Sequence, residues 1–227
     1  MGRIELIPLQ QDELWWRLVR FGFRLLYNEM AWTYDWVSWS VSLGHWRAWQ
    51  RASIPHLPTD ADALILELAH GTGDLQLDLL AAGRRTIGFD LSPYMGRITR
   101  RKLRRAGHSP KLVRGMAQHL PFPGALFDGV VATFPTEFII QPETLSDIQR
   151  VLKPGGRLVL VPNGRLEITN VLVRFLEWLY TITGQRGPWP VDLEARFTQA
   201  GFQVRSITER LPGSEVWIVI AEKGAAW

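Results

Sequence analysis

Residues Leu64 to Asp90 read LILELAHGTGDLQLDLLAAGRRTIGFD, and this stretch decides the fold. The apolar run 64–68 predicts a buried strand. A glycine turn, a helix over 75–82 and a second strand over 86–89 follow it. Asp90 closes the second strand. Such a unit is typical of adenosine sites, because glycines let the backbone approach the ligand and the acid accepts hydrogen bonds from ribose hydroxyls.

The glycine turn separates two classes of cofactor. Dinucleotide sites use G-x-G-x-x-G, but this chain has Gln76 where the third glycine would stand after Gly71 and Gly73. Asp74 also places a negative charge where a pyrophosphate would sit. A cofactor that carries adenosine without phosphate fits better, and we expect S-adenosylmethionine.

The chain resembles the class I S-adenosylmethionine-dependent methyltransferases, type 11, in the subgroup of the ubiquinone/menaquinone and phospholipid methyltransferases. The family motif E-x-G-x-G-x-G maps onto Glu67 to Gly73, with Ala69 in place of the first glycine. Asp90 maps onto the ribose-binding acid. The resemblance covers residues 60–162 well and implies these cofactor-binding residues: Glu67, Ala69, His70, Gly71, Gly73, Asp90, Leu91, Met116, Ala117 and Thr133.

Later motifs follow in the family's order. The stretch D-A-x-x-L-P-F maps onto residues 116–122, where Met116 replaces the acid that would face the adenine amine. Backbone groups near Ala117, or the amide of Gln118, could take over that contact. The runs 127–131 and 150–158 match the fourth strand and the turn into the fifth. Residues 133–137, TFPTE, lie where the family contacts the methyl group and the acceptor.

Alternation of apolar runs and helical patterns predicts an α/β fold. We expect strands at 63–69, 86–90, 111–114, 127–133, 156–162, 202–209 and 214–222, and helices at 73–82, 92–106, 142–152 and 192–200. Ser92 is the expected N-cap of the second of these helices. The prediction is a Rossmann-like, seven-stranded, mostly parallel sheet with helices on both faces and an antiparallel last strand.

Two apolar segments lie outside this pattern. In residues 12–32 the polar positions form one narrow stripe, as in a basic amphipathic helix that lies in a membrane surface or packs on the domain. Residues 165–183 repeat the pattern, so the insert 165–190 could wall an acceptor pocket, contact lipid or make a dimer. We therefore divide the chain into a lid or membrane-contact segment, 1–58, and a methyltransferase domain, 59–227.

Candidate catalytic residues come from the resemblance and from position. Residues 33–51 resemble the N-terminal lid of quinone methyltransferases, which implies that Tyr34 and His45 cap the cofactor and touch the acceptor. Both could equally be helix-packing residues. Glu137 follows the fourth strand and is a candidate base or amine anchor, or else a surface acid at a helix start.

Composition narrows the remaining possibilities. The 227 residues suit one α/β domain, the absence of cysteine excludes disulfides and thiol nucleophiles, and the five scattered histidines suggest no metal site. No secretion signal or membrane-spanning run is expected. The run 97–105, RITRRKLRR, could touch phosphates of lipid or nucleic acid, or be a solvated helix face.

These observations predict a methyltransferase that acts on a small apolar or lipid-like acceptor, such as an isoprenoid quinol or a phospholipid headgroup. The alternatives are a soluble enzyme that methylates a small apolar metabolite, and a non-catalytic interaction protein on the same scaffold. The expected location is the cytoplasm, either free or at the inner face of the membrane. We do not expect nucleic acid as a partner, and the apolar helices could support an oligomer.

Overall fold

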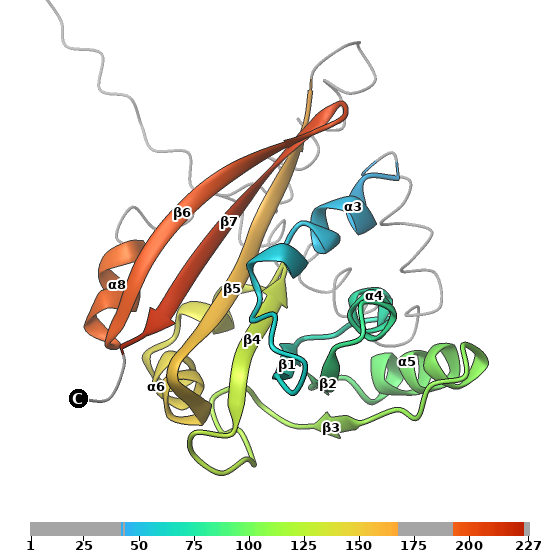
Figure 1. Ribbon diagram of the computed structural model, residues 1–227, viewed down its shortest axis with the longest axis horizontal. Coiled ribbons are helices and arrows are strands. Elements are labelled where there is room, and N and C mark those ends of the chain that lie inside the picture. Colours follow the sequence, from blue (N-terminus) through green and yellow to red (C-terminus); the bar gives the residue numbers. More distant parts are fainter. Residues whose placement is uncertain (1–41, 43, 168–192, 225–227) are drawn as a thin grey trace, which may run out of the picture.

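The computed structural model describes residues 42, 44–167 and 193–224 (Figure 1). Seven strands form one sheet in the order β3-β2-β1-β4-β5-β7-β6. The strands are β1 (Leu64–Leu68), β2 (Arg85–Asp90), β3 (Leu112–Arg114), β4 (Phe127–Thr133), β5 (Leu152–Leu166), β6 (Phe202–Leu211) and β7 (Ser214–Lys223). Strands β1 to β5 pair in parallel, and β7 runs antiparallel to both β5 and β6. The predicted seven-stranded architecture is confirmed.

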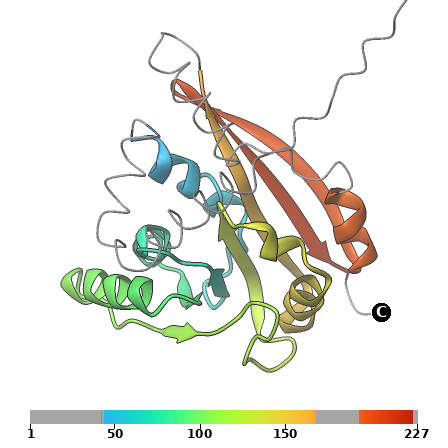
Figure 2. The same ribbon diagram turned by 180° about the vertical axis from the view of Figure 1, so that it is seen from behind.

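Helices cover both faces of the sheet (Figures 1 and 2). They are α3 (Trp46–Arg51), α4 (Asp74–Ala81), α5 (Pro93–Arg105), α6 (Pro142–Val151) and α8 (Leu193–Gln199), with short 3₁₀ turns η2 (Ile54–His56) and η3 (Glu137–Ile140). On one face, α6 and α8 pack on Leu66, Val130 and Leu158. On the other, α3 and α4 pack on Ile65, Val131 and Val159. Neighbouring strand residues thus alternate between two cores, as the side-chain alternation of a strand requires.

Most predicted boundaries agree with the structure to within one or two residues. The Ser92 hydroxyl caps α5 by accepting a hydrogen bond from the Met95 amide at 3.3 Å. Strand β5 is the main difference, because it begins at Leu152 and ends at Leu166 instead of spanning 156–162. Leu152 pairs with Phe127 before a register shift, and the far end stays paired with the long strand β7.

The predicted helical insert at 165–190 therefore begins too early. Arg165 pairs with Glu215, and Leu166 pairs with Ser214, so both still belong to β5. The rest of that insert, and the predicted amphipathic helix 12–32, lie outside the described residues. Within the part of the chain that the structure describes, no helix is long and apolar enough to cross a bilayer.

The described end of the segment 1–58 packs directly on the sheet. Trp49 of α3 is 1% exposed and shares a hydrophobic cluster with Val161 and Val216. Its indole Nε1 donates to the Ser214 hydroxyl at 3.1 Å, across 165 residues of sequence. Gly164 makes room for this indole, because an added Cβ there would lie 2.3 Å from Trp49 Cδ2. Residues 46–57 therefore share the core of the domain that follows them.

Candidate functional site

The carboxyl ends of β1, β2, β3 and β4 meet at one edge of the sheet, where open α/β folds hold their ligands. The loop after β1 has an unusual backbone there, since Ala69, Gly71 and Gly73 have φ of 54°, 53° and 82°. A Cβ on Gly71 would meet nothing within 4 Å, so the backbone at this position is open to a ligand. A Cβ on Gly73 would lie 2.4 Å from Thr99 Cγ2, because α4 and α5 approach closely there.

Asp90, at the end of β2, holds this loop in place. One carboxylate oxygen accepts from the Gly71 amide at 2.9 Å, and the other accepts from the Ser92 amide at 2.8 Å. The side chain is only half-buried, so oxygen lone pairs remain for a ligand. An acid fixed in this way can accept hydrogen bonds from ribose hydroxyls without first being ordered.

Glu67 lies on β1 below the loop and is 1% exposed. Burial raises the pKa of Glu67 to about 8, and the nearby Gln76 amide offsets this only in part. Glu67 Oε2 and Gln76 Nε2 are nevertheless buried without a hydrogen-bond partner within 3.5 Å. A buried carboxyl group with an unused oxygen suits a cationic or hydrogen-bond-donating ligand.

His70, in the glycine loop, does not face solvent. It is 4% exposed, and its Nδ1 lies 2.9 Å from the Gly71 carbonyl oxygen and 3.2 Å from Thr99 Oγ1. Burial lowers the pKa of His70, although Asp90 partly opposes this, so its ring is neutral at neutral pH. Its described contacts tie the loop to α5.

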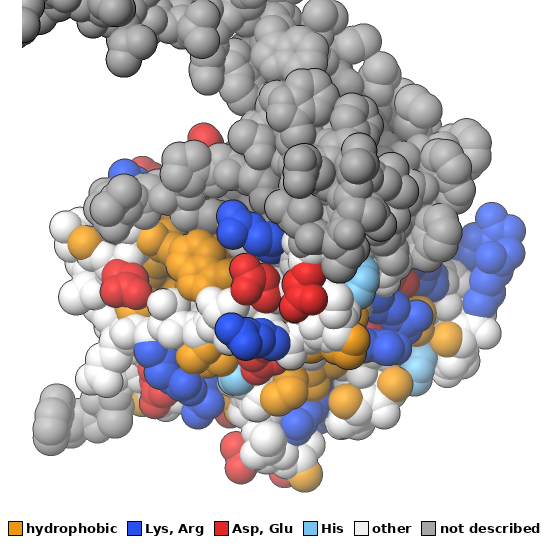
Figure 3. All heavy atoms as spheres, turned by 90° about the horizontal axis from the view of Figure 1, so that it is seen from above, with side chains coloured by type: hydrophobic (Ala, Val, Ile, Leu, Met, Phe, Trp, Pro, Cys, Tyr) orange, Lys and Arg blue, Asp and Glu red, His pale blue; other side chains and the backbone are white. Residues whose placement is uncertain are grey.

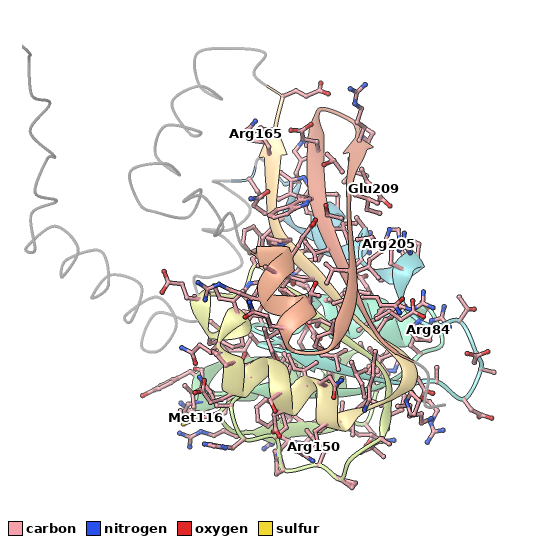
Figure 4. The ribbon with its side chains drawn as sticks, turned by 90° about the vertical axis from the view of Figure 1, so that its left-hand side faces the viewer. Arg84, Met116, Arg150, Arg165, Arg205 and Glu209 are labelled. Atoms are coloured by element: carbon pink, nitrogen blue, oxygen red, sulfur yellow. The ribbon has the colours of Figure 1, made fainter. Side chains whose placement is uncertain are left out.

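Exposed apolar side chains lie at the same edge of the sheet as Asp90. Leu91 is 59% exposed, Met116 is 52% exposed, and Tyr94 is 37% exposed; these are the large hydrophobic side chains that stand exposed within the described ranges. Leu91 and Met116 follow the ends of adjacent strands, and Figure 4 shows Met116 at the margin of the molecule. Ala117 is buried. The two exposed side chains offer an apolar surface for a flat heterocycle.

The Gln118 amide has another use. Its Nε2 donates to Gln141 Oε1 at 2.6 Å, so the structure joins it to the residue before α6. Met116 therefore remains the candidate for contact with an adenine ring.

Aromatic rings gather where β4 ends. Phe134 has a φ of 51°, which is costly for a residue with a Cβ, and its ring stacks on Trp46 of α3 with centroids 4.0 Å apart. The ring of Trp49 meets Phe134 edge-on at 6.1 Å. Thr133 is buried and accepts from Gln50 Nε2 at 3.2 Å. Since Leu68 pairs with Ala132, this aromatic cluster stands beside the glycine loop.

The three candidate catalytic residues are not brought together. Tyr34 lies outside the described residues. His45 precedes α3, stacks on Trp49 and places its Nδ1 3.1 Å from the Ser214 hydroxyl. Glu137 is exposed at the first position of η3, as the surface alternative anticipated. Their catalytic roles remain predictions.

An ion-pair cluster that sequence reasoning missed fixes α3 to α4. Asp78 is 8% exposed, and its carboxylate accepts from Arg47 at 2.8 Å and from Arg51 at 2.7 Å. These contacts hold the pKa of Asp78 below its ordinary value despite its burial. The signal in the sequence was an aspartate among the leucines of the run 77–80.

The sequence is similar to those of known proteins. The model of the ubiE/COQ5 methyltransferase family matches residues 22–203. The chain belongs to this family. It is 34% identical to a demethylmenaquinone methyltransferase of Thermus thermophilus, over 79% of this chain and 92% of the relative. It is 30% identical to one of Symbiobacterium thermophilum, over 79% and 84% of the two chains.

The fold recurs in solved structures of low sequence identity. A putative methyltransferase of Bacillus halodurans superposes with a TM-score of 0.59 at 17% identity, covering 78% of this chain and 99% of that one. The phosphoethanolamine N-methyltransferase 2 of Haemonchus contortus, solved with S-adenosylhomocysteine, gives 0.60 at 14% identity, covering 81% and 53%. The chain is a methyltransferase, and S-adenosylmethionine is its methyl donor, as predicted.

The residues present fit this donor. Asp90 offers fixed acceptors for the ribose, the open backbone at Gly71 admits a ligand, and Glu67 has a free buried oxygen for a cationic group. The first turn of α4 is unsuited to a pyrophosphate, because Asp74 is there and pairs with Lys102 at 3.0 Å.

Proposed function

We propose that this methyltransferase transfers the methyl group of S-adenosylmethionine to a ring carbon of a demethylated isoprenoid quinol. The observation that carries the proposal is the aromatic cluster of Phe134, Trp46 and Trp49 beside the glycine loop. Trp49 is buried behind this cluster, and a planar quinol ring can stack on the partly exposed rings of Trp46 and Phe134, since offset and edge-on aromatic contacts are favourable. The names of the two relatives support the same class of acceptor.

S-adenosylmethionine supplies an electrophilic methyl group. We assign the adenosine to Asp90, Leu91, Met116 and Ala117, and the remaining part of the donor to the loop of Glu67, Ala69, His70, Gly71 and Gly73, with Thr133 facing the methyl group. The task of the protein is then to hold the ring carbon in line with the methyl–sulfur bond and to exclude water.

Carbon methylation also requires the loss of one proton. The ring carbon forms a bond to the methyl group while the methyl–sulfur bond breaks, and the proton that this carbon carried must pass to a base before the ring is aromatic again. Tyr34, His45 and Glu137 are the proposed groups for this transfer or for positioning the acceptor. Of these, His45 belongs to the same aromatic cluster through its stacking on Trp49.

The proposal includes contact with the membrane, because an isoprenoid quinol is a lipid. We place the enzyme in the cytoplasm, at the inner face of the membrane, with the segments 12–32 and 167–183 as its apolar contacts or as oligomer interfaces. The alternatives are a phospholipid headgroup as acceptor, a soluble enzyme that acts on a small apolar metabolite, and a non-catalytic protein on this scaffold.

A radiolabel transfer assay tests the acceptor. Purified full-length protein is mixed with methyl-labelled donor and a short-chain demethylated naphthoquinol, kept reduced, in detergent. We expect label in the quinol with the wild-type protein and no label when the quinone is kept oxidised, because the oxidised ring lacks a nucleophilic carbon. Label in phospholipid headgroups but not in the quinol would move the acceptor to the first alternative.

Variants separate the donor site from the acceptor surface. Asp90→Asn should weaken S-adenosylhomocysteine binding at least tenfold in calorimetry. This is the change in Kd expected when a hydrogen bond to a charged group, which contributes about 1.5 kcal/mol, is lost. Asp60→Asn removes an exposed carboxylate elsewhere and should leave binding unchanged. Phe134→Leu should raise the quinol KM with donor affinity retained. No donor binding by folded wild-type protein would favour the non-catalytic alternative.

A further inference from the structure

The outward face of α5 carries a dense positive charge. Met95, Thr99 and Leu103 are buried against the domain, and the opposite side of the helix presents exposed arginines. Their spacing spreads them over one continuous arc of about 140°, at 100° per residue. Together they line a single surface hollow: Arg97, Arg100, Arg101, Arg104 and Arg105. Figure 3 shows basic side chains at the right-hand end, the side on which α5 lies in Figure 1, and others elsewhere on the same face.

These charges are not used to stabilise the described fold. Lys102, between them in sequence, pairs with Asp74 on α4. None of the five arginines pairs with an acidic side chain among residues 42, 44–167 and 193–224, and Arg97 instead lies 4.5 Å over the ring of Tyr94. Five like charges on thirteen residues repel one another, so a surface of this kind favours an anionic partner.

The neighbouring apolar side chains indicate what kind of anion. Tyr94 lies on the same side of α5 as the arginines, and exposed Leu91 directly precedes Ser92, the N-cap of the helix. Arginines beside an exposed aromatic and an aliphatic side chain match a bilayer surface, where phosphates lie next to the apolar interior. A nucleic-acid site would instead place its aromatic rings along a basic groove.

From this arrangement we infer that the arginine face of α5 binds anionic phospholipid headgroups. Contact there brings Leu91, beside the donor site, close to the bilayer. This inference rests on the proposed function, since a lipid acceptor gives the enzyme a reason to lie on the membrane. It assigns the contact to a described surface, in addition to the apolar segments proposed above.

Vesicle flotation of the full-length protein tests the inference. The vesicles contain phosphatidylcholine alone or with about one third phosphatidylglycerol. We expect binding that requires the anionic lipid and weakens as salt is raised. The variant Arg101→Gln/Arg104→Gln, at the centre of the arc, should reduce partitioning about tenfold or more, since each basic residue near such a surface contributes about fivefold.

A matched control removes the same charge elsewhere. Arg205→Gln/Arg210→Gln changes two exposed arginines of β6, and Figure 4 shows Arg205 on that strand, well apart from Met116. This control should bind vesicles like the wild type. Equal partitioning of the α5 variant and the wild type would overturn the inference. So would salt-dependent binding of an unrelated RNA without binding of anionic vesicles, which would make nucleic acid the partner.

The detergent assay keeps the two proposals distinguishable. With the short-chain quinol in detergent, the α5 variant should retain wild-type methyl transfer, because none of its changed residues belongs to the donor or acceptor site. Loss of vesicle binding with retained transfer supports the inference. Absence of transfer in the wild type, with vesicle binding intact, would count against the quinol acceptor and leave the lipid contact standing.

Discussion

The buried carboxyl of Glu67 should make the stability of this protein depend on pH in an unusual direction. Burial raises its pKa from an ordinary 4.5 to about 8. Between these values the folded chain holds a proton that the unfolded chain releases. The free energy of unfolding contributed by this group is therefore complete below pH 4.5, falls by about 1.4 kcal/mol per pH unit as pH rises, and levels off above pH 8.

The variant Glu67→Gln isolates this contribution, because glutamine has nearly the same shape and does not titrate. Over three pH units, from 5 to 8, the wild type should lose about 4 kcal/mol relative to the variant. Urea unfolding measures the difference, and the eleven tryptophans provide a fluorescence signal. His70 titrates in both proteins and cancels in the comparison.

The control for this experiment is Asp60→Asn, which removes an exposed carboxylate. Its free energy of unfolding should change with pH in the same way as that of the wild type. If the wild type and Glu67→Gln differ by the same amount at pH 5 and pH 8, the carboxyl is ionised throughout. The argument that burial keeps this carboxyl protonated in the folded chain would then be wrong.

Three further predictions concern the backbone of the loop and the docking of α3. Gly73→Ala should destabilise the protein by about 2 kcal/mol more than Gly71→Ala in thermal or urea unfolding. Both glycines have positive φ, but only a Cβ on Gly73 would meet Thr99. Equal losses of stability would mean that the Thr99 side chain moves aside freely. Ala69→Gly should leave stability unchanged or raise it by up to about 1 kcal/mol. Glycine relieves the strained φ of 54°, but it also increases the conformational entropy of the unfolded chain, which partly offsets the gain. A clear loss of stability would contradict this. Asp78→Asn should cost about 1 to 3 kcal/mol at pH 7 and progressively less as pH falls below 3.8, because the pKa of this carboxyl is lowered in the folded state and its contribution is lost only as that group is protonated. A loss that does not change with pH would exclude the charge as its cause.

The sequence predicted the parts of this molecule that depend on local pattern. Apolar runs predicted the bounds of β1, β2 and β4 to within one residue, and Ser92 indicated where α5 begins. The turn residues 153–156, KPGG, led to a late start for β5, because pairing of Leu152 with Phe127 is a tertiary contact that outweighs local turn preference.

The site was predictable only where a ligand dictates the residue type. Asp90 and the glycines stand out because their chemistry is needed at fixed spacing. Contacts between distant segments left no such signal. The hydrogen bonds of Ser214 to Trp49 and His45 join residues more than 160 positions apart, and the stacking of Trp46 on Phe134 joins α3 to β4. These contacts are consequences of packing, and local periodicity does not encode them.

The two hydrogen bonds of Asp90 to backbone amides also bear on how quickly the donor can bind. A carboxylate already fixed by Gly71 and Ser92 loses little rotational entropy when a ribose arrives, and the loop has no new shape to adopt. Association should therefore be limited by diffusion and access to this edge of the sheet, and not by a slow rearrangement of the glycine loop. Discrimination among adenosine-containing ligands would then appear chiefly in their dissociation rates.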